Sequence, residues 1–260
     1  MSVADGMASP RPAGERIPAA TLGATIAAAL LLALSADAGL PYVVLAVALG
    51  GYVVAFGLPA VMGATDIARS TAVLSVATLT GAWSMLRADG ASSLRLLPVA
   101  IAVSLVASFV AQLTRRDSRP ALTRCLAGDA FGITAIVSGM ALAPLVDLRP
   151  DDVVVAAAMA GIVGASLMDP LAGRIEPELL MPGGLVLGAL ASAGVGLVAP
   201  SGAALWVYAV IGAVAGTGAQ SVRRLLASLA GPDRGELAVA VCGVLLPGLA
   251  VFAVARLLLG

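Results

Sequence analysis

Two matching hexapeptides carry the side chains with the clearest chemical potential in this sequence. Segments 111–116 and 219–224 both read Ala-Gln-x-x-Arg-Arg. A carboxamide can hydrogen-bond across helices or to a polar ligand. Paired guanidinium groups can bind phosphate bidentately and attract anionic lipid headgroups at the inner leaflet. The candidates for binding a substrate or a lipid headgroup are therefore Gln112, Arg115, Arg116, Gln220, Arg223 and Arg224.

Each of these side chains also has an explanation that requires no ligand. A glutamine at a helix end can reach headgroups or water, and arginines gather beside the inner leaflet in most membrane proteins. The general enrichment of arginine beside the inner leaflet accounts for basic loops. It accounts less well for an Arg-Arg pair that recurs at the same position of both hexapeptides.

Three acidic residues lie near predicted helix boundaries. Asp169, which precedes Pro170, is a further candidate, because a carboxylate deeper than the membrane interface is costly and marks function. If its helix ends at Met168, the same carboxylate is merely solvated. Asp129 and Glu236 are expected in the first turn of their helices, where a carboxylate favours the helix N-terminus.

Missing residue types exclude several kinds of chemistry. The chain has no His and no Lys, which excludes His-based hydrolysis, His metal sites and a Walker A lysine. Cys125, expected in a loop, and Cys242, expected inside a helix, form neither a disulfide framework nor a metal site. We expect no metal and no cofactor, and the net charge of zero gives no indication of nucleic-acid binding.

The elements that position these residues are predicted to be membrane-spanning helices. Hydrophobic residues make up 60% of the 260 residues and charged residues 12%, whereas a soluble domain is about a quarter charged. After a polar tail over 1–16, which we expect to be disordered and cytoplasmic, apolar runs of spanning length follow. Nine spans are predicted, the third of them short: 18–36, 41–63, 68–86, 96–114, 128–146, 152–172, 182–199, 202–221 and 236–258.

Arginine placement predicts the orientation. With the N-terminus in the cytoplasm, eleven arginines lie on the inner side and four on the outer side, as the positive-inside rule requires. Nine spans then place the C-terminus outside. The first span could instead be a cleaved signal peptide, with 36–38 (Ala-Asp-Ala) as the cleavage site; we favour retention because of the duplication described next.

An internal duplication is predicted from matches at offsets of about 104 to 110 residues. Besides the two hexapeptides, 137–139 (Val-Ser-Gly) aligns with 241–243 (Val-Cys-Gly), and Pro144 is near-equivalent to Pro247. Two tandem four-helix units with basic loops, 17–126 and 127–235, would be followed by a final helix in 236–260. Since each unit has an even number of spans, the repeats would be parallel. Small-residue pairs such as Gly184/Gly188 and Gly212/Gly216 predict close helix packing.

The loop 115–122, Arg-Arg-Asp-Ser-Arg-Pro-Ala-Leu, resembles a segment in uncharacterised multi-pass membrane proteins of high-GC actinobacteria. The resemblance covers this loop and, more loosely, the helices. It implies a plasma-membrane location and carries no activity.

These observations predict an all-α polytopic bundle in the lipid bilayer. Our leading hypothesis is a transporter, permease or flippase-like protein, which requires a central cavity between the repeats lined by Gln112, Gln220 or Asp169. A non-catalytic scaffold or assembly partner would show a tightly packed bundle with an exposed small-residue face. A lipid-modifying enzyme, the third hypothesis, needs two carboxylates within metal-bridging distance.

The basic loop after the fourth span gives a first testable prediction. The double variant Arg115→Ala/Arg116→Ala should weaken binding of the purified protein to anionic liposomes, because these guanidinium groups would face inner-leaflet headgroups. The matched control is Arg87→Ala/Arg95→Ala on the predicted outer side. Equal losses in the two variants would remove the case for a special inner-leaflet loop.

Overall fold

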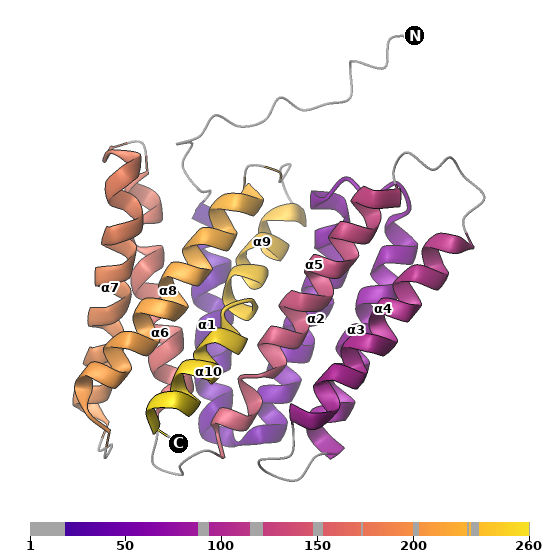
Figure 1. The fold of residues 1–260 in the computed structure, drawn as a ribbon. Helices are drawn as coiled ribbons and strands as arrows, with labels where there is room; N and C mark the ends of the chain where they lie inside the picture. Colours follow the sequence, from indigo (N-terminus) through magenta and orange to yellow (C-terminus); the bar gives the residue numbers. More distant parts are fainter. Residues whose placement is uncertain are drawn as a thin grey trace.

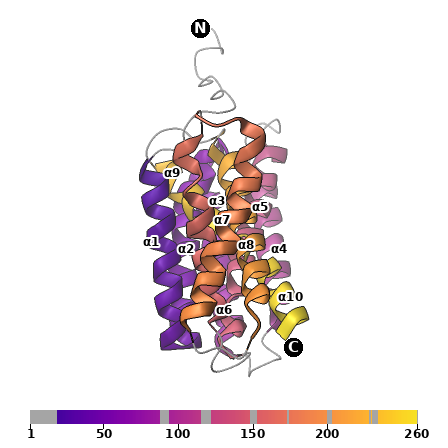
Figure 2. The ribbon, with the colours of Figure 1, turned by 90° about the vertical axis from the view of Figure 1, so that its left-hand side faces the viewer.

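The computed structural model describes residues 19–87, 94–114, 122–147, 153–172, 174–199, 203–227, 229 and 234–259, and this part of the chain is helical and contains no β-strand. Its helices run up and down one bundle (Figures 1 and 2). The α-helices are α1 (Ala19–Ala38), α2 (Leu40–Val61), α3 (Ile67–Arg87), α4 (Leu97–Leu113), α5 (Leu122–Met140), α6 (Val154–Ser166), α7 (Pro177–Val198), α8 (Leu205–Ala227), α9 (Arg234–Leu245) and α10 (Gly248–Leu259). Two 3-10 turns, η4 (Ala143–Leu145) and η5 (Asp169–Leu171), follow α5 and α6.

The outer surface of the bundle is apolar. Eight helical segments of the described chain are long and apolar enough, by length and composition, to cross a membrane. Large hydrophobic side chains such as Leu113 and Leu257 are about 80% exposed (79% and 83%), a pattern that water does not tolerate over so wide a surface. The chain therefore has the character of a multi-pass membrane protein.

Helix α3 differs from these eight segments in polarity. It has 21 residues and runs the length of the bundle (Figure 1), but it carries several hydroxyl side chains. Those of Thr78 and Ser84 are buried and donate to carbonyls of their own helix, Leu74 O and Gly81 O. The prediction of nine spans, which includes this helix, stays a prediction.

Two groups of helices make up the bundle, and three further helices, α1, α9 and α10, connect them. Helices α6, α7 and α8 pack closely on one another at one side, while α2, α3, α4 and α5 pack together at the other. Helices α1 and α9 lie between, because α1 contacts α2, α6 and α9, and α9 contacts α2, α5 and α8. Helix α5 runs across the expected boundary at 126/127 and packs with the helices before it. The duplication itself stays a prediction.

Glycines allow α6, α7 and α8 to approach at backbone distance. A Cβ on Gly161 of α6 would lie 2.5 Å from the Cα of Gly212 on α8, and a Cβ on Gly188 of α7 would lie 2.9 Å from the carbonyl oxygen of Gly212. Gly216 meets Gly161 in the same way, with 2.8 Å between its Cβ position and the Gly161 carbonyl oxygen. The predicted small-residue packing is therefore present in this group, where no side chain fits between the helices.

At Pro59 and at Pro247, a hydroxyl from a neighbouring helix bonds to backbone groups beside the proline. In α2, Pro59 has no N–H to donate to the carbonyl four residues earlier, and Thr71 Oγ1 of α3 donates to that carbonyl, Ala55 O, at 3.0 Å. Pro247 separates α9 from α10. There Ser138 Oγ of α5 donates to Leu246 O at 2.5 Å and accepts from the Leu249 N–H at 2.8 Å.

Arginines mark one end of the bundle and tryptophans the other. At the end where α2, α4 and α8 finish and α3, α5 and α9 begin lie Arg69, Arg124, Arg174, Arg223, Arg224 and Arg234; we call this the arginine-rich end. Trp83 and Trp206, both more than half exposed, lie near the opposite end, where α3 finishes and α8 begins. Aromatic side chains of this kind are enriched at membrane interfaces.

The glycine contacts of α6, α7 and α8 predict an asymmetric response to a single methyl group. Gly161→Ala should lower the melting temperature of the detergent-solubilised protein by several degrees, because the methyl would overlap the α8 backbone and overpacking costs about 1–3 kcal/mol. Gly194→Ala on α7, where nothing lies within 4 Å, should be neutral or slightly stabilising. An unchanged melting temperature for Gly161→Ala would contradict this packing.

Candidate functional site

Asp129 belongs to the first of two buried polar centres, and its position differs from the sequence prediction. Helix α5 begins at Leu122, so Asp129 lies in its third turn, where it is 1% exposed, and not in the first turn. Cys125, expected in a loop, is likewise helical and buried. The prediction failed because the first turns of α5 are amphipathic: Thr123 and Arg124 face outward, while Cys125 and Asp129 face inward at helical spacing.

The Asp129 centre joins α4 to α5. From α4, Ser108 Oγ donates to Asp129 Oδ2 at 2.8 Å, and Gln112 Nε2 donates to the same oxygen at 3.3 Å. Both α4 side chains are buried. The carboxylate therefore has two neutral donors, and both contact one of its oxygens.

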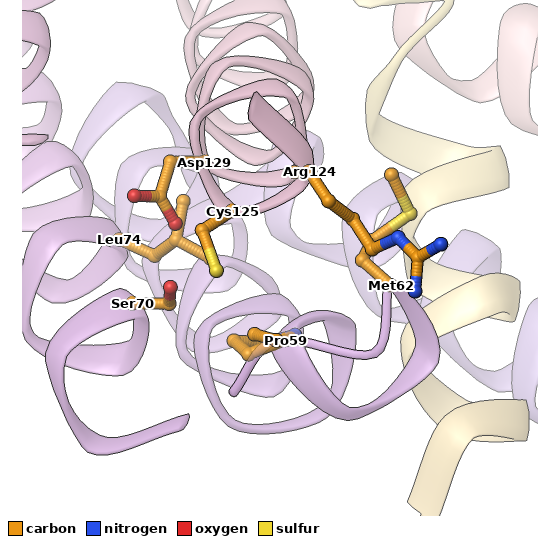
Figure 3. A pocket seen from close by; sticks show the side chains of 9 residues that line it. Pro59, Met62, Ser70, Leu74, Arg124, Cys125 and Asp129 are labelled. Carbon is orange, nitrogen blue, oxygen red and sulfur yellow. The ribbon is translucent and has the colours of Figure 1, made fainter. Parts of the chain in front are cut away.

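A small cavity lies beside this carboxylate, between α2, α3 and α5 (Figure 3). It has about 10 Å³ of room, about what one water or one small ion needs. Ser70 Oγ lines it together with Asp129 and Cys125, and this hydroxyl is buried without a hydrogen-bond partner. Arg124 stands at its rim, with the guanidinium turned toward Met62 and away from Asp129 (Figure 3).

The second centre is built around Arg223 of α8, which is 0% exposed. Sequence analysis placed Arg223 and Arg224 in a loop after a span ending at 221, but α8 continues to Ala227. The stem of Arg223 packs on α9, where a Cβ on Gly243 would lie 2.7 Å from Arg223 Cγ. We call Arg223, Asp169, Gln220 and the adjacent Arg224 the Arg223 centre.

Asp169 is the ionic partner of Arg223. Helix α6 ends at Ser166, yet Asp169 in the following η5 turn is 1% exposed and is not solvated. Arg223 Nε donates a hydrogen bond to Asp169 Oδ2 at 3.1 Å. Arg223 Nη2 lies 3.0 Å from the same oxygen, but the geometry there is not that of a hydrogen bond. A bidentate pair would use both carboxylate oxygens, so this pair leaves Oδ1 unused.

Gln220 completes the centre from one turn before Arg223. Its Nε2 donates to Leu180 O of α7 at 3.1 Å. Gly184 makes this approach possible, because a Cβ at that position would collide with the carboxamide of Gln220. The Gln220 Oε1 atom is buried and has no hydrogen-bond partner.

Unused hydrogen-bonding capacity is concentrated in these two centres. Six buried side-chain atoms of the described residues have no hydrogen-bond partner, and five of them belong to the Arg223 centre. The Arg223 centre contains both orphaned donors and orphaned acceptors. The sixth atom is Ser70 Oγ, which lies near Asp129. Buried polar groups are nearly always paired, so orphaned ones require an explanation such as a bound water, ion or ligand. The orphaned atoms of the Arg223 centre are Asp169 Oδ1, Gln220 Oε1, Arg223 Nη1, Arg223 Nη2 and Arg224 Nη2.

The predicted site residues thus divide between two places. Gln220, Asp169, Arg223 and Arg224 lie together, whereas Gln112 lies on α4 with Asp129, in the other group of helices. The cavity beside Asp129 is lined by none of Gln112, Gln220 or Asp169. Arg115 and Arg116 lie outside the described residues.

A second concavity has a different character. An apolar groove of about 990 Å³ opens on the outer surface between α2, α3 and α9. The hydroxyl of Thr71 in its lining is already bonded to Ala55 O. Acyl chains suit this groove, and polar chemistry does not. Its lining residues are Leu49, Tyr52, Val53, Phe56, Gly57, Ile67, Ala68, Thr71 and Leu237.

Comparisons with known proteins add no assignment to this geometry. No protein-family model, curated protein or solved structure matches the chain. The sites must therefore be interpreted from their own residues.

Sequence reasoning missed Ser70, Ser108 and Asp129 as site residues. The spacing of four between Ser108 and Gln112, which places both on one face of a helix, could have indicated Ser108.

The buried ion pair gives a stability prediction. Asp169→Asn alone or Arg223→Gln alone should destabilise the protein by about 3–5 kcal/mol, because each leaves an uncompensated buried charge. The double variant should recover much of this loss, since it contains no unpaired charge. Thermal melting of the detergent-solubilised variants measures the effect.

The control for this experiment is the partly exposed pair formed by Asp66 and Arg69, whose side chains are 30% and 42% exposed. Removing either partner there should cost at most about 1 kcal/mol. If the Asp169/Arg223 double variant were as unstable as the sum of the single variants, the two charges would not compensate one another.

Proposed function

We propose that this chain is a plasma-membrane transporter of the permease or flippase-like type, with the Arg223 centre as its substrate site. The observation that carries the proposal is the group of orphaned donors and acceptors around Arg223 and Asp169. Charged groups inside a membrane are expensive, and they commonly mark substrate pathways.

The position of Asp169 supports this proposal. Its carboxylate belongs to a 3-10 turn just beyond the end of α6, within a segment apolar enough to span a membrane. Interrupted helices build the substrate sites of many transporters, because their free ends offer unpaired polar groups near the membrane interior. The residues of this centre lie where α6, α7, α8 and α9 meet. A substrate would reach the orphaned atoms when these helices move apart.

The chemistry of the centre suggests the class of substrate. Arg223 Nη1 and Nη2 would bind a carboxylate or phosphate, while Asp169 Oδ1 and Gln220 Oε1 would accept hydrogen bonds from an ammonium or hydroxyl group. A small zwitterion or a zwitterionic headgroup meets both requirements. By the positive-inside rule, the arginine-rich end and the centre near it would face the cytoplasm.

A non-catalytic scaffold is the second candidate, and the glycine contacts of α6, α7 and α8 favour it. Backbones that touch at Gly161, Gly188 and Gly212 leave little room for a solute between these helices. Under this hypothesis the orphaned atoms are satisfied by fixed waters. Stability would then not respond to small zwitterions.

The lipid-modifying enzyme needs two neighbouring carboxylates, and Asp129 and Asp169 belong to separate centres.

Ligand-dependent stability distinguishes the two candidates. The full chain in nanodiscs is melted with amino acids, phosphocholine or inorganic phosphate as probes. At least one zwitterionic probe should raise the melting temperature by several degrees, because saturation at a hundred times Kd stabilises by about 2.7 kcal/mol. Gln220→Met keeps the side-chain volume but removes Oε1 and should abolish that rise. Any probe that binds is then tested for uptake into proteoliposomes.

The matched control is Ser221→Ala, the neighbouring residue, whose exposed hydroxyl bonds only to Thr217 O in its own helix. It should keep the full response to the probe. If every probe shifted the wild type and Gln220→Met equally, or shifted neither protein, the transporter proposal would fail and the scaffold would remain.

A further inference from the structure

The carboxyl group of Asp129 is buried and has no cationic partner among the residues that the structure describes. It is 1% exposed, and the ion pairs found among the described residues are Arg69–Asp66 and Arg223–Asp169. A buried carboxylate costs several kcal/mol unless a compensating charge is present. Ser108 and Gln112 supply only neutral hydrogen bonds, which reduce that cost but do not cancel the charge.

The geometry leaves room for such a charge on one side of the carboxylate. Both neutral donors contact Oδ2, so Oδ1 is not used by either of them. The cavity of about 10 Å³ adjoins the carboxylate, and its size fits one water or a small ion with little or no hydration.

Ser70 provides a second, independent oxygen in the same cavity. Its side chain is 2% exposed, and Oγ has no hydrogen-bond partner. Figure 3 shows this hydroxyl directed toward the side of the cavity where Asp129 and Cys125 lie. Two serines of the same helix, Ser75 and Ser84, instead donate to their own backbone carbonyls. Ser70 thus differs from them in keeping its oxygen free for a ligand.

We propose that the cavity formed by Asp129 and Ser70 is a binding site for a monovalent cation of the size of Na⁺. Hard cations prefer oxygen ligands, and a carboxylate oxygen and a hydroxyl oxygen face this space. A single carboxylate balances one positive charge, and no group of three potential metal-ligating Asp, Glu, Cys or His residues occurs within the described part of the chain. A divalent ion would leave one positive charge unbalanced beside this single carboxylate.

The surroundings of the cavity are compatible with a cation. Arg124 is the cationic side chain of its lining. Its guanidinium lies beside Gly63, where Nη1 is 3.8 Å from the position of a Gly63 Cβ, and it points away from the carboxylate (Figure 3). The arginine therefore stands at the rim, at the arginine-rich end, without occupying the place of the ion. The site is independent of the Arg223 centre.

Sodium-dependent stability tests the inference on the full chain in detergent. NaCl is titrated against N-methyl-D-glucamine chloride at constant ionic strength and constant pH, and the melting temperature is recorded. The wild type should become more stable with Na⁺, and less so with K⁺. Asp129→Asn, a neutral isostere, should fold without Na⁺ and show no sodium response. Ser70→Ala should shift half-saturation to at least about tenfold higher Na⁺.

Controls separate the site from general salt effects and from the proposed substrate site. Asp66→Asn, a partly exposed carboxylate at the same end, Ser75→Ala on the same helix and Gln220→Met should all keep the wild-type sodium response. Binding of radioactive sodium to the purified protein is the second measurement. An identical sodium response in Asp129→Asn overturns the proposal, as does a stability that follows pH but not Na⁺, because the cavity would then hold only water beside a protonated carboxyl group.

Discussion

Within an apolar bundle, each backbone or side-chain polar group must find a partner inside the protein, because lipid offers none. This constraint explains the positions of many hydroxyl side chains. Thr71 covers the carbonyl that Pro59 leaves free, and Ser138 serves both sides of the break at Pro247. Prolines are tolerated in these helices because a neighbouring helix supplies the missing hydrogen bond. The remaining orphaned atoms are therefore informative, since the rest of the bundle leaves so few.

The same constraint determines how the helices are grouped. Where α6, α7 and α8 meet, glycines bring the backbones into direct contact, and packing alone holds the group together. Around Asp129 and Arg223, hydrogen bonds and charges join α4 to α5 and η5 to α8. The two centres thus lie in different helix groups, with α1 and α9 between them. The two centres therefore share no residue.

Hydrophobic runs predicted the helices well where a helix is apolar on all sides. The second predicted span, 41–63, corresponds to α2 at Leu40–Val61. The prediction failed where the terminal turns of a helix carry polar residues on one face, as at the start of α5 and the end of α8. Asp129 was assigned to a first turn and Arg223 to a loop for this reason.

The pairing of Arg223 with Asp169 could not be predicted from the sequence. It depends on η5 turning back under α8, and no local pattern encodes a contact between residues 54 positions apart. What the sequence did indicate was a short set of candidates, including Gln220, Asp169 and Arg223. The structure brought those three together and separated Gln112 from them.

Helix α5 carries a consequence of its own. Asp129 and Ser138 are nine residues apart, so they lie about 13.5 Å apart along the axis and on opposite faces of the helix. One face holds Ser108 and Gln112 of α4, and the other holds the junction of α9 and α10. A rotation of α5 about its axis that withdrew Asp129 from α4 would also pull Ser138 away from Leu246. The contacts of α5 with α4 and with the junction of α9 and α10 are therefore coupled in any rigid rotation of this helix.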